Sequence, residues 1–436
     1  MKRTDNQARF DALRQEFSTF TFEKQTVTRV DGGLFLAFDF SLDDRYHFRP
    51  TLEIMPRPFF SWDSIPEAQL QSLAFQIGMT ELVSYWKIAC PKRVVVKPFA
   101  LTETQKSFWK KLYYNGLGEF LYLNNITVSE ADLMEIECDG SRSFAKIDIP
   151  LDERTLVPVG GGKDSVVTLE CLRKEMPVIP LIVNPRGATL NCVHTAGYAQ
   201  NDFIVINRTL DSTMLKLNAE GYLNGHTPFS ALLAFITVLV AFGSRSKYIA
   251  LSNENSANES TVPGTNINHQ YSKSIEFERD FRNYVAENLN DNVQYFSFLR
   301  PLSELQIAKL FAQCEAYHPV FRSCNVGSKT DSWCGHCPKC LFTWIILSPF
   351  LSKEKLTAVF GKDLMEDESL RPVFEELNGT AAVKPFECVG TVEEVQACME
   401  AINGKRDKVN EILNRFNNEH FLPESFEQIL KSHLHV

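Results

Sequence analysis

The feature that most constrains the fold is a glycine-rich segment near the middle of the chain, Val159-Gly-Gly-Gly-Lys-Asp-Ser165. Residues 155–159 before it are typical of a short buried strand, and residues 166–173 after it are typical of the first turns of a helix. Glycine lets backbone N–H groups approach a ligand without an intervening Cβ atom, and a helix N-terminus adds unpaired donors and partial positive charge. A strand, a glycine run and a helix in this order therefore predict an anion site.

Three side chains that follow the glycines fit an anionic ligand. Lys163 can add a full positive charge, Asp164 can meet a cation that accompanies a phosphate, and Ser165 can cap the helix or donate to an oxygen. The residue order matches neither a Walker A loop, G-x-x-x-x-G-K-[ST], nor a dinucleotide-binding G-x-G-x-x-G. A tight glycine turn without a ligand is the alternative.

The segment resembles the S-G-G-x-D-S loop of the ATP pyrophosphatase (PP-loop) superfamily. Members of that superfamily cleave ATP between the α and β phosphates and transfer AMP to an oxygen. Gly160 stands where the superfamily usually has serine, which removes one hydroxyl and keeps the backbone cradle. The resemblance implies that ATP binds to Gly160, Gly161, Gly162, Lys163, Asp164 and Ser165.

Composition disfavours several classes of protein. The formal net charge of −9 argues against a nucleic-acid partner, because phosphate binding usually shows as a basic excess. The longest apolar run, residues 229–242, is too short to span a bilayer and predicts a buried helix. The polar N-terminal sequence predicts no secretion signal, so the 11 cysteines are not expected to form disulfides. We expect a cytoplasmic protein with a small-molecule substrate and no membrane segment, and the sequence does not indicate its oligomeric state.

The first 150 residues are predicted to form a separate α+β domain. Hydrophobic alternation between residues 20 and 40, interrupted by an Asp-Gly-Gly turn, indicates a β-hairpin. Residues 66–87 and 102–112 have the pattern of helices, whereas three prolines within residues 49–60 favour a connector. No catalytic constellation is found here, so we interpret this domain as a scaffold or as a platform for substrate recognition.

From about residue 151, predicted strands and helices alternate, which indicates a parallel sheet. We predict an α/β fold, with a parallel-sheet PP-loop (HUP-like) core over residues 151–350 and a helical C-terminal region over residues 351–436. Strands are expected at residues 178–183, 203–206 and 248–251. Ligands of open α/β sheets lie beyond the carboxyl ends of strands, so Asn184, directly after the first of these strands, is a candidate for an adenosine pocket.

Two polar segments are candidates for substrate contact. Residues 252–260 include Glu254 and come directly after a predicted buried strand, where substrates bind in α/β proteins. Residues 268–274 combine His269, a potential base, with Lys273, a cation able to neutralise phosphate charge. Ordinary polar loops are the alternative for both segments.

A third candidate segment, residues 384–391, interrupts the C-terminal helices and is flanked by proline and glycine. It contains Glu387 and Cys388, whose side chains both exchange protons when their pKa values are suitably shifted. The alternative is a plain connector that begins the next helix at Thr391, a typical N-cap residue.

Four of the cysteines form the second strong signal. Cys334, Cys337 and Cys340 follow a C-x-x-C-x-x-C rhythm, and Cys324 lies ten positions earlier. Four thiolates make a closed tetrahedral zinc site, which favours a structural role. An iron–sulfur cluster also takes four cysteines, a nearby histidine can replace one ligand, and buried free cysteines are the alternative without a metal.

Six segments, in this order and at this chain length, resemble the MurL family, the UDP-N-acetylmuramoyl-L-alanyl-L-glutamate epimerases of bacterial peptidoglycan synthesis. They are GGGKDS, SNENSANES, NHQYSKS, HPVFRSCN, WCGHCPKC and KPFECVGT. The family uses ATP and Mg²⁺ to convert the terminal L-Glu of the nucleotide dipeptide to D-Glu, and it releases AMP and pyrophosphate. Adenylation neutralises the carboxylate, so that the Cα proton can be removed and returned on the other face.

The resemblance implies roles for the candidate residues. Residues 160–165 hold pyrophosphate, Asp164 meets Mg²⁺, and Lys273 neutralises phosphate. Candidates for substrate contact or proton transfer are Glu254, His269, Glu387 and Cys388. The loop and the cysteines also resemble the shorter deazapurine nitrile synthase of queuosine biosynthesis. Another adenylating enzyme (an amide or nitrile synthase or a nucleobase thiolase) and a non-catalytic nucleotide sensor are therefore the alternatives.

Overall fold

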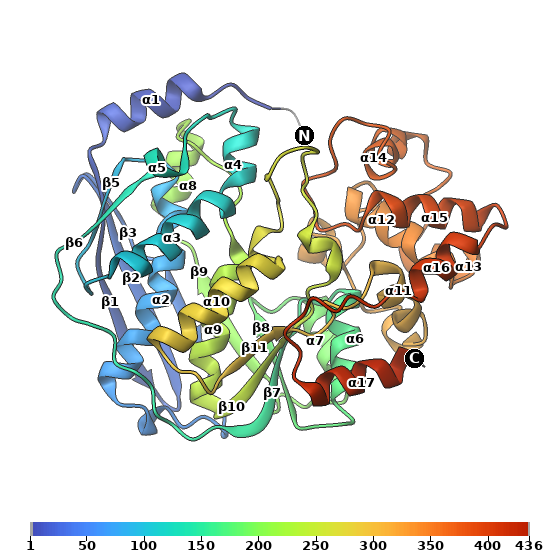
Figure 1. Cartoon of the computed structure of the whole chain (residues 1–436), viewed down its shortest axis with the longest axis horizontal. Helices are drawn as coiled ribbons and strands as arrows, with labels where there is room; N and C mark the ends of the chain where they lie inside the picture. Colours follow the sequence, from blue (N-terminus) through green and yellow to red (C-terminus); the bar gives the residue numbers. More distant parts are fainter. Residues whose placement is uncertain (1–2, 435–436) are drawn as a thin grey trace. The chain divides into compact units, whose positions relative to one another are not determined.

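The computed structural model describes residues 3–434, which form two compact units (Figure 1). Each unit is drawn from several stretches of the chain rather than from one. Unit 1 combines the residues up to Asp152 with Ile206–Lys247 and Gln270–Gln294, and unit 2 combines Glu153–Val205, Tyr248–His269 and the residues from Tyr295 onward. The predicted helical C-terminal region reaches residue 436, and its last two residues lie outside the described residues.

Unit 1 is built on a mixed sheet. Its strands are β1 (Thr19–Val30), β2 (Gly33–Leu42), β3 (Tyr46–Phe48), β4 (Thr51–Ile54), β5 (Arg93–Val96), β6 (Glu135–Cys138) and β9 (Ile204–Thr209). The first two residues of β9 belong to unit 2. The order is β9-β4-β2-β1-β5-β6, with β3 paired to β2. The predicted hairpin is confirmed, since β1 and β2 are antiparallel and turn at Asp31 and Gly32, which both have positive φ. The pairs β1–β5 and β5–β6 are parallel.

The segment predicted as a connector, residues 49–60, contains strand β4. This strand pairs antiparallel with β2 on one side and with β9 on the other. Pro50 and Pro56 lie outside the paired residues, where a missing N–H removes no ladder hydrogen bond. The connector prediction is therefore wrong for Thr51–Ile54, because the prolines mark the limits of a strand.

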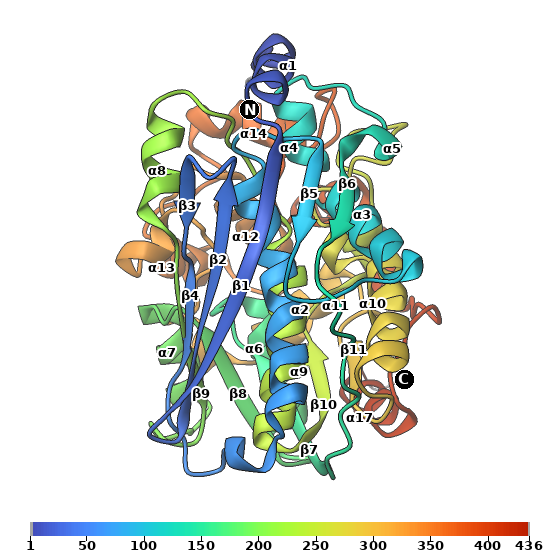
Figure 2. The same cartoon turned by 90° about the vertical axis from the view of Figure 1, so that its left-hand side faces the viewer.

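Helices cover the sheet of unit 1. They are α1 (Gln7–Glu16), α2 (Glu67–Trp86), α3 (Glu103–Gly116), α4 (Gly118–Leu123), α5 (Glu130–Leu133), α8 (Ser212–Ala219), α9 (Phe229–Ser244) and α10 (Ile275–Asn288). The predicted helices are present as α2, α3 and the buried α9. Helix α2 packs against β1 and β2 and also contacts α9 (Figure 2). No helix of residues 3–434 is long and apolar enough to cross a membrane.

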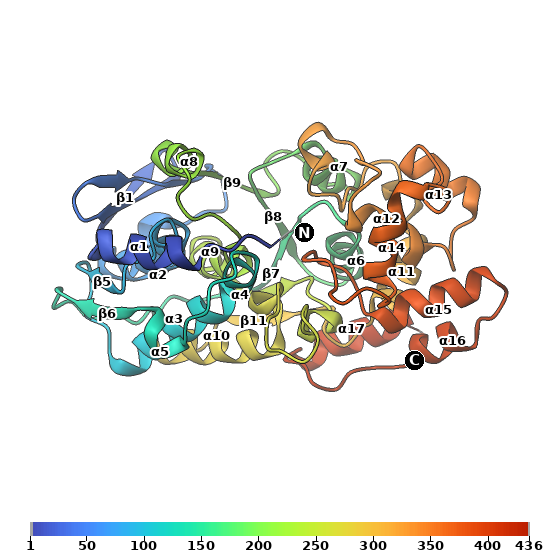
Figure 3. The same ribbon diagram turned by 90° about the horizontal axis from the view of Figure 1, so that it is seen from above.

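Unit 2 is built on strands β7 (Asp152–Pro158), β8 (Val178–Val183), β10 (Ser246–Leu251) and β11 (Gln294–Ser297) in the order β11-β10-β7-β8. The first residue of β7, the first two of β10 and the first of β11 belong to unit 1. The predicted parallel arrangement is confirmed for β7 and β8. Its helices are α6 (Lys163–Leu172), α7 (Gly187–Thr195), α11 (Glu304–Ala312), α12 (Pro338–Leu347), α13 (Lys353–Phe360), α14 (Arg371–Leu377), α15 (Val392–Ile402), α16 (Asp407–Leu413) and α17 (Glu424–Leu434). Helix α11 packs against α6, α12 and α16 (Figure 3). The chain is therefore an α/β protein with a helical C-terminal region.

Candidate functional site

The glycine segment joins β7 to α6, and space is tight at two of its three glycines. Gly161 has φ of +80°, and a Cβ atom there would lie 3.0 Å from the backbone of α7. A Cβ atom on Gly162 would lie 2.9 Å from the hydroxyl oxygen of Ser323. At Gly160, by contrast, no described atom lies within 4 Å of a Cβ atom, so a serine side chain has room. The backbone conformation therefore favours glycine at Gly161, a side chain at Gly162 requires the Ser323 hydroxyl to move, and glycine is optional at Gly160.

Hydrogen bonds fix the loop and leave donors at the start of α6. The backbone N–H of Arg322 donates to the carbonyl oxygen of Gly161 (2.7 Å), and the Ser165 hydroxyl donates to the carbonyl oxygen of Gly162 (3.1 Å). Because the N-cap residue of α6 is Gly162, no N-cap side chain accepts from the first turn of this helix. These backbone donors, with the positive end of the helix dipole, can bind an anion.

Lys163 is buried at the start of α6, and its ammonium contacts the carboxylates of Asp164 and Glu304. Glu304, the first residue of α11, is also buried. Burial alone lowers the pKa of Lys163, but the two carboxylates more than offset this effect and raise the pKa above its ordinary value. Lys163 therefore keeps its positive charge inside the protein.

Two more buried carboxylates lie close to Glu304. Burial and the charges of Asp164, Glu254 and Glu394 raise the pKa of Glu304, and the Lys163 ammonium opposes this rise by stabilising the ionised carboxylate. We call these five side chains the Lys163 network. It contains one cation and four carboxyl groups, so it carries excess negative charge when all are ionised.

Glu254 and Glu394 have separate structural partners. The Oε1 atom of Glu254 accepts from the Ser256 hydroxyl (2.8 Å). The Oε1 atom of Glu394 accepts from the backbone N–H of Leu305 in α11 (3.1 Å), and its Oε2 atom accepts from the backbone N–H of Thr391 at the start of α15 (2.9 Å). One carboxylate therefore caps two helices, and burial raises its pKa although these hydrogen bonds oppose the shift.

The segment of residues 384–391 reaches the Lys163 network. Lys384 contacts the carboxylate of Glu259, in the loop after β10, and its ammonium donates to the carbonyl oxygen of Gly390 (3.0 Å). A Cβ atom on Gly390 would lie 2.8 Å from the Glu394 carboxylate and 3.1 Å from Cγ of Glu304. The segment thus lies directly against two of the buried glutamates.

Glu387 lies within the same segment and is half-buried. Its Oε2 atom accepts from the side-chain amide of Asn325 (3.0 Å). Burial raises the pKa of Glu387; the positive charges of Lys339 and His269 oppose the shift, and the Cys388 thiol adds to it. His269, predicted from one segment, is therefore close enough to influence Glu387, predicted together with Cys388 from another.

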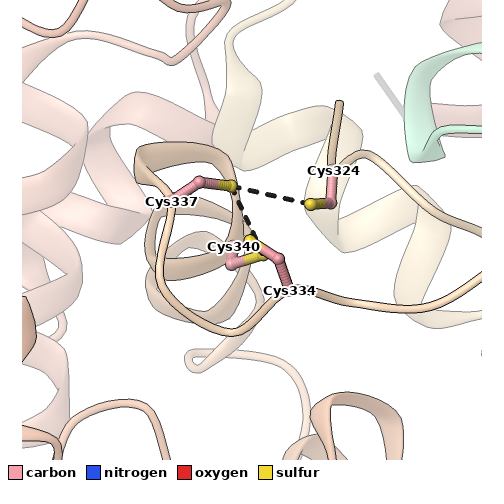
Figure 4. Close-up of side chains that lie close together, drawn as sticks. All are labelled: Cys324, Cys334, Cys337 and Cys340. Carbon is pink, nitrogen blue, oxygen red and sulfur yellow. Dashed lines mark hydrogen bonds between the residues drawn. The ribbon is translucent and has the colours of Figure 1, made fainter. Parts of the chain in front are cut away.

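The four predicted cysteines come together at the start of α12, and we call them the cysteine centre (Figure 4). Cys337 is the N-cap residue of α12, Pro338 is its first residue, and Cys340 is on its first turn. The Sγ atoms of Cys324 and Cys337 lie 3.7 Å apart, those of Cys334 and Cys340 3.6 Å, and those of Cys337 and Cys340 3.5 Å. These separations are far too long for a disulfide.

The cysteine centre has the geometry of a single-metal site. Four sulfurs placed 2.3 Å from a central zinc ion lie about 3.8 Å apart, which matches these separations. The hydrogen bond between the Cys337 and Cys340 sulfurs is the main cause that lowers the pKa of Cys337, to about 5, so this sulfur ionises readily. The backbone N–H of Gly327 donates to Sγ of Cys324 (3.1 Å). These donors stabilise thiolates, which are the form that binds metal.

Family models for a MurL N-terminal domain and a MurL C-terminal domain match residues 11–298 and 320–426. The chain belongs to the MurL family. Three relatives carry the name UDP-N-acetyl-alpha-D-muramoyl-L-alanyl-L-glutamate epimerase. The Micromonospora sp. protein is 36% identical over 87% of this chain and 86% of its own length, and the Salinispora tropica protein is 38% identical over 72% and 69%. The Xanthomonas oryzae pv. oryzae protein is 31% identical over 92% and 90%. Membership places the chain among enzymes named as epimerases, which are isomerases.

Two predicted residues of this MurL-family chain, Asn184 and Lys273, are far apart in the sequence and belong to different units. Asn184 follows β8 directly and has φ of +51°, a conformation that asparagine tolerates. Lys273 ends a short 3-10 helix, Tyr271–Lys273, and belongs to unit 1, whereas the other predicted site residues belong to unit 2.

Two residues of the Lys163 network, Glu304 and Glu394, are absent from the sequence-based predictions. Each sits at the start of a helix that a capping box begins, Ser303 with Gln306 for α11 and Thr391 with Glu394 for α15. Acidic residues are common in the first turn of any helix. Their sequence signal is therefore indistinguishable from an ordinary helix start.

Proposed function

We propose that the chain converts the terminal L-Glu of UDP-N-acetylmuramoyl-L-alanyl-L-glutamate to D-Glu in an ATP-dependent reaction of peptidoglycan synthesis. The observation that carries this proposal is membership of the MurL family, with three relatives named for this substrate at 31–38% identity. We place the reaction in the cytoplasm and assign it no nucleic-acid partner.

Adenylation of the glutamyl α-carboxylate is the proposed first step. A carboxylate oxygen attacks the α phosphorus of ATP, and pyrophosphate leaves. In the resulting acyl-adenylate the carboxylate charge is gone, so the electrons left by removal of the Cα proton can delocalise as an enolate. Reprotonation on the opposite face inverts the centre, and water releases AMP and D-Glu.

The glycine loop is the proposed ATP site, on a core of the PP-loop type. Its support is the free first turn of α6, the buried charge of Lys163, and the space at Gly160 for the serine of the PP-loop pattern. Mg²⁺ bound at Asp164 would neutralise phosphate charge. Asn184 is proposed to line the adenosine pocket, and Lys273 to neutralise phosphate.

Proton transfer at Cα is proposed for the group formed by His269, Glu387 and Cys388, with Glu254 as a further substrate contact. A raised pKa makes the Glu387 carboxylate a stronger base than an exposed one. Glu387→Gln and Cys388→Ala variants are each expected to lose epimerisation while they keep pyrophosphate release. Full epimerisation by both variants would remove this pair from the mechanism.

A structural zinc ion is proposed for the cysteine centre. The sulfur separations of 3.5–3.7 Å suit one ion. An iron–sulfur cluster inserts several iron atoms between its cysteines, which holds their sulfurs further apart. Because Ser323, next to Cys324, lies against Gly162, the metal would also fix one wall of the glycine loop.

The test of the function is incubation with ATP, Mg²⁺ and the L-Ala-L-Glu nucleotide in D₂O. AMP release is followed together with deuterium at the glutamyl Cα and with chiral analysis after hydrolysis. AMP with deuterated D-Glu is the expected result. AMP without inversion would replace the epimerase with another adenylating enzyme, and the absence of AMP would remove adenylation altogether.

A further inference from the structure

Glu304 lies in the Lys163 network but has no role in the function proposed above. It is 141 residues from Lys163 in the sequence, and its carboxylate nevertheless contacts the Lys163 ammonium. Both side chains are 4% exposed. The pair of Lys163 and Glu304 is therefore the most enclosed ion pair next to the glycine loop. A charge buried in this way needs a partner of opposite sign.

The ammonium of Lys163 has a donor left over. A lysine ammonium carries three N–H donors. In the described part of the chain, Asp164 and Glu304 are the two groups that accept from it. One N–H is therefore available for a ligand oxygen, beside the free first turn of α6.

Glu304 is held firmly in place. Ser303 and Gln306 cap α11 reciprocally around it. The next residue, Leu305, donates its backbone N–H to Glu394. Gly390 approaches Cγ of Glu304 so closely that a Cβ atom would lie 3.1 Å away. The carboxylate is thus fixed by groups on two helices and one loop, as a positioning residue requires.

We propose that Glu304 is a positioning residue for phosphate binding, which keeps the buried Lys163 ammonium charged and fixed beside the glycine loop. The inference rests on the proposed function in one respect, that the ligand is ATP. Asp164 also contacts the Lys163 ammonium and raises its pKa, but the Asp164 carboxylate is one-third exposed, whereas that of Glu304 is buried, so Glu304 is the partner that fixes the ammonium inside the protein.

The central experiment compares wild type with Glu304→Gln across pH 6.5 to 9.5, with a non-hydrolysable ATP analogue as the probe. Glutamine keeps the shape and removes the charge. Burial then lowers the pKa of Lys163 with less opposition, so the variant loses the ammonium as pH rises, whereas wild type keeps it. Analogue affinity is expected to be similar near pH 6.5 and to fall in the variant by about tenfold per pH unit above the lowered pKa.

Two further variants complete the design. Glu393→Gln, on the exposed first turn of α15, removes a glutamate that pairs with Arg415 on the surface, and it should keep the wild-type profile. Glu304→Asp keeps the charge on a shorter side chain; it should keep a flat profile with affinity reduced severalfold. If Glu304→Gln does not fold, Glu304→Asp provides the test instead. An affinity of this variant for the analogue equal to that of wild type would then overturn the inference.

The outcomes separate this inference from the proposed function. Parallel profiles for wild type and folded Glu304→Gln would overturn the role of Glu304 alone. If wild type binds the analogue but never forms D-Glu, the epimerase fails while the pH profile still decides the role of Glu304. Failure of folded wild type to bind the analogue would overturn both.

Discussion

The cysteine centre and the Lys163 network are both built at helix N-termini of unit 2, but their members come together in different ways. Three of the four cysteines lie within seven consecutive residues, and the start of α12 alone sets Cys337 and Cys340 side by side. The Lys163 network instead joins the starts of α6, α11 and α15 across more than 200 residues. One cluster is local, and the other exists only when three helices have packed.

This difference shows how far the stability of each cluster depends on the rest of the fold. A local set of thiolates can gain its stability from the metal itself. A buried network of one ammonium and several carboxylates is stable only while burial and pairing are both complete, because an unpaired buried charge destabilises the chain. The following predictions are ordered from the largest expected effect to the smallest.

Removal of the metal should have the largest effect. Cys340→Ser is expected to abolish stoichiometric metal binding and to lower the thermal stability strongly, since zinc sites in small domains bind by about 10–16 kcal/mol. Metal content is measured by mass spectrometry and stability by thermal unfolding. Cys138→Ser, which changes a cysteine of unit 1 outside the four-cysteine cluster, is the control. Full metal occupancy in the Cys340 variant would contradict a four-cysteine site.

Loss of the buried ammonium should affect chemistry and leave the metal in place. Lys163→Met is expected to lower the rate of AMP release by about 10²–10³-fold, the usual effect of removing one preorganised charge or donor from a reacting centre. Lys174→Met, just beyond the end of α6, should react at the wild-type rate. A concurrent loss of zinc in the Lys163 variant would show that the two clusters are not independent.

Removal of the Glu394 carboxylate, which caps two helices, should have an intermediate effect on stability. Glu394→Ala is expected to reduce the free energy of unfolding by about 1–3 kcal/mol, because buried N–H groups of two helices lose their acceptor. Since the pKa of Glu394 is raised in the folded chain, its contribution to stability declines as pH rises through that folded pKa. Denaturant unfolding between pH 4 and 8 checks both points, and a Gln variant should lack the pH dependence.

Substitutions at two glycines of the run, Gly161 and Gly160, should have the smallest effects and should differ from each other. Gly161→Ser is expected to reduce the free energy of unfolding by about 1–2 kcal/mol, because its φ of +80° is unfavourable with a Cβ atom. Gly160→Ser should change it by less than about 0.5 kcal/mol, because the surrounding space is open. Equal losses at both positions, measured by urea titration, would contradict the loop geometry.

Local patterns in the sequence predicted much of the fold. The Asp-Gly turn between β1 and β2, the buried helix α9 and the strand–glycine–helix order around Gly161 each depend on neighbouring residues, and each is present. Strand β4 is missing from the prediction, because it is only four residues long and one of its two partners, β9, lies about 150 residues further along the chain. The contribution of three separate stretches to each unit likewise depends on contacts that no local pattern records.

The sequence by itself indicated the cluster of cysteines and the glycine loop, since C-x-x-C spacing and a glycine run act through the backbone of adjacent residues. Only the tertiary structure decided that Glu304 pairs with Lys163 and is influenced by Glu394, and that His269 comes close to Glu387. The physical reason is that helix-start glutamates are usually solvated. Burial by packing between distant segments is what turns them into partners of a charged site.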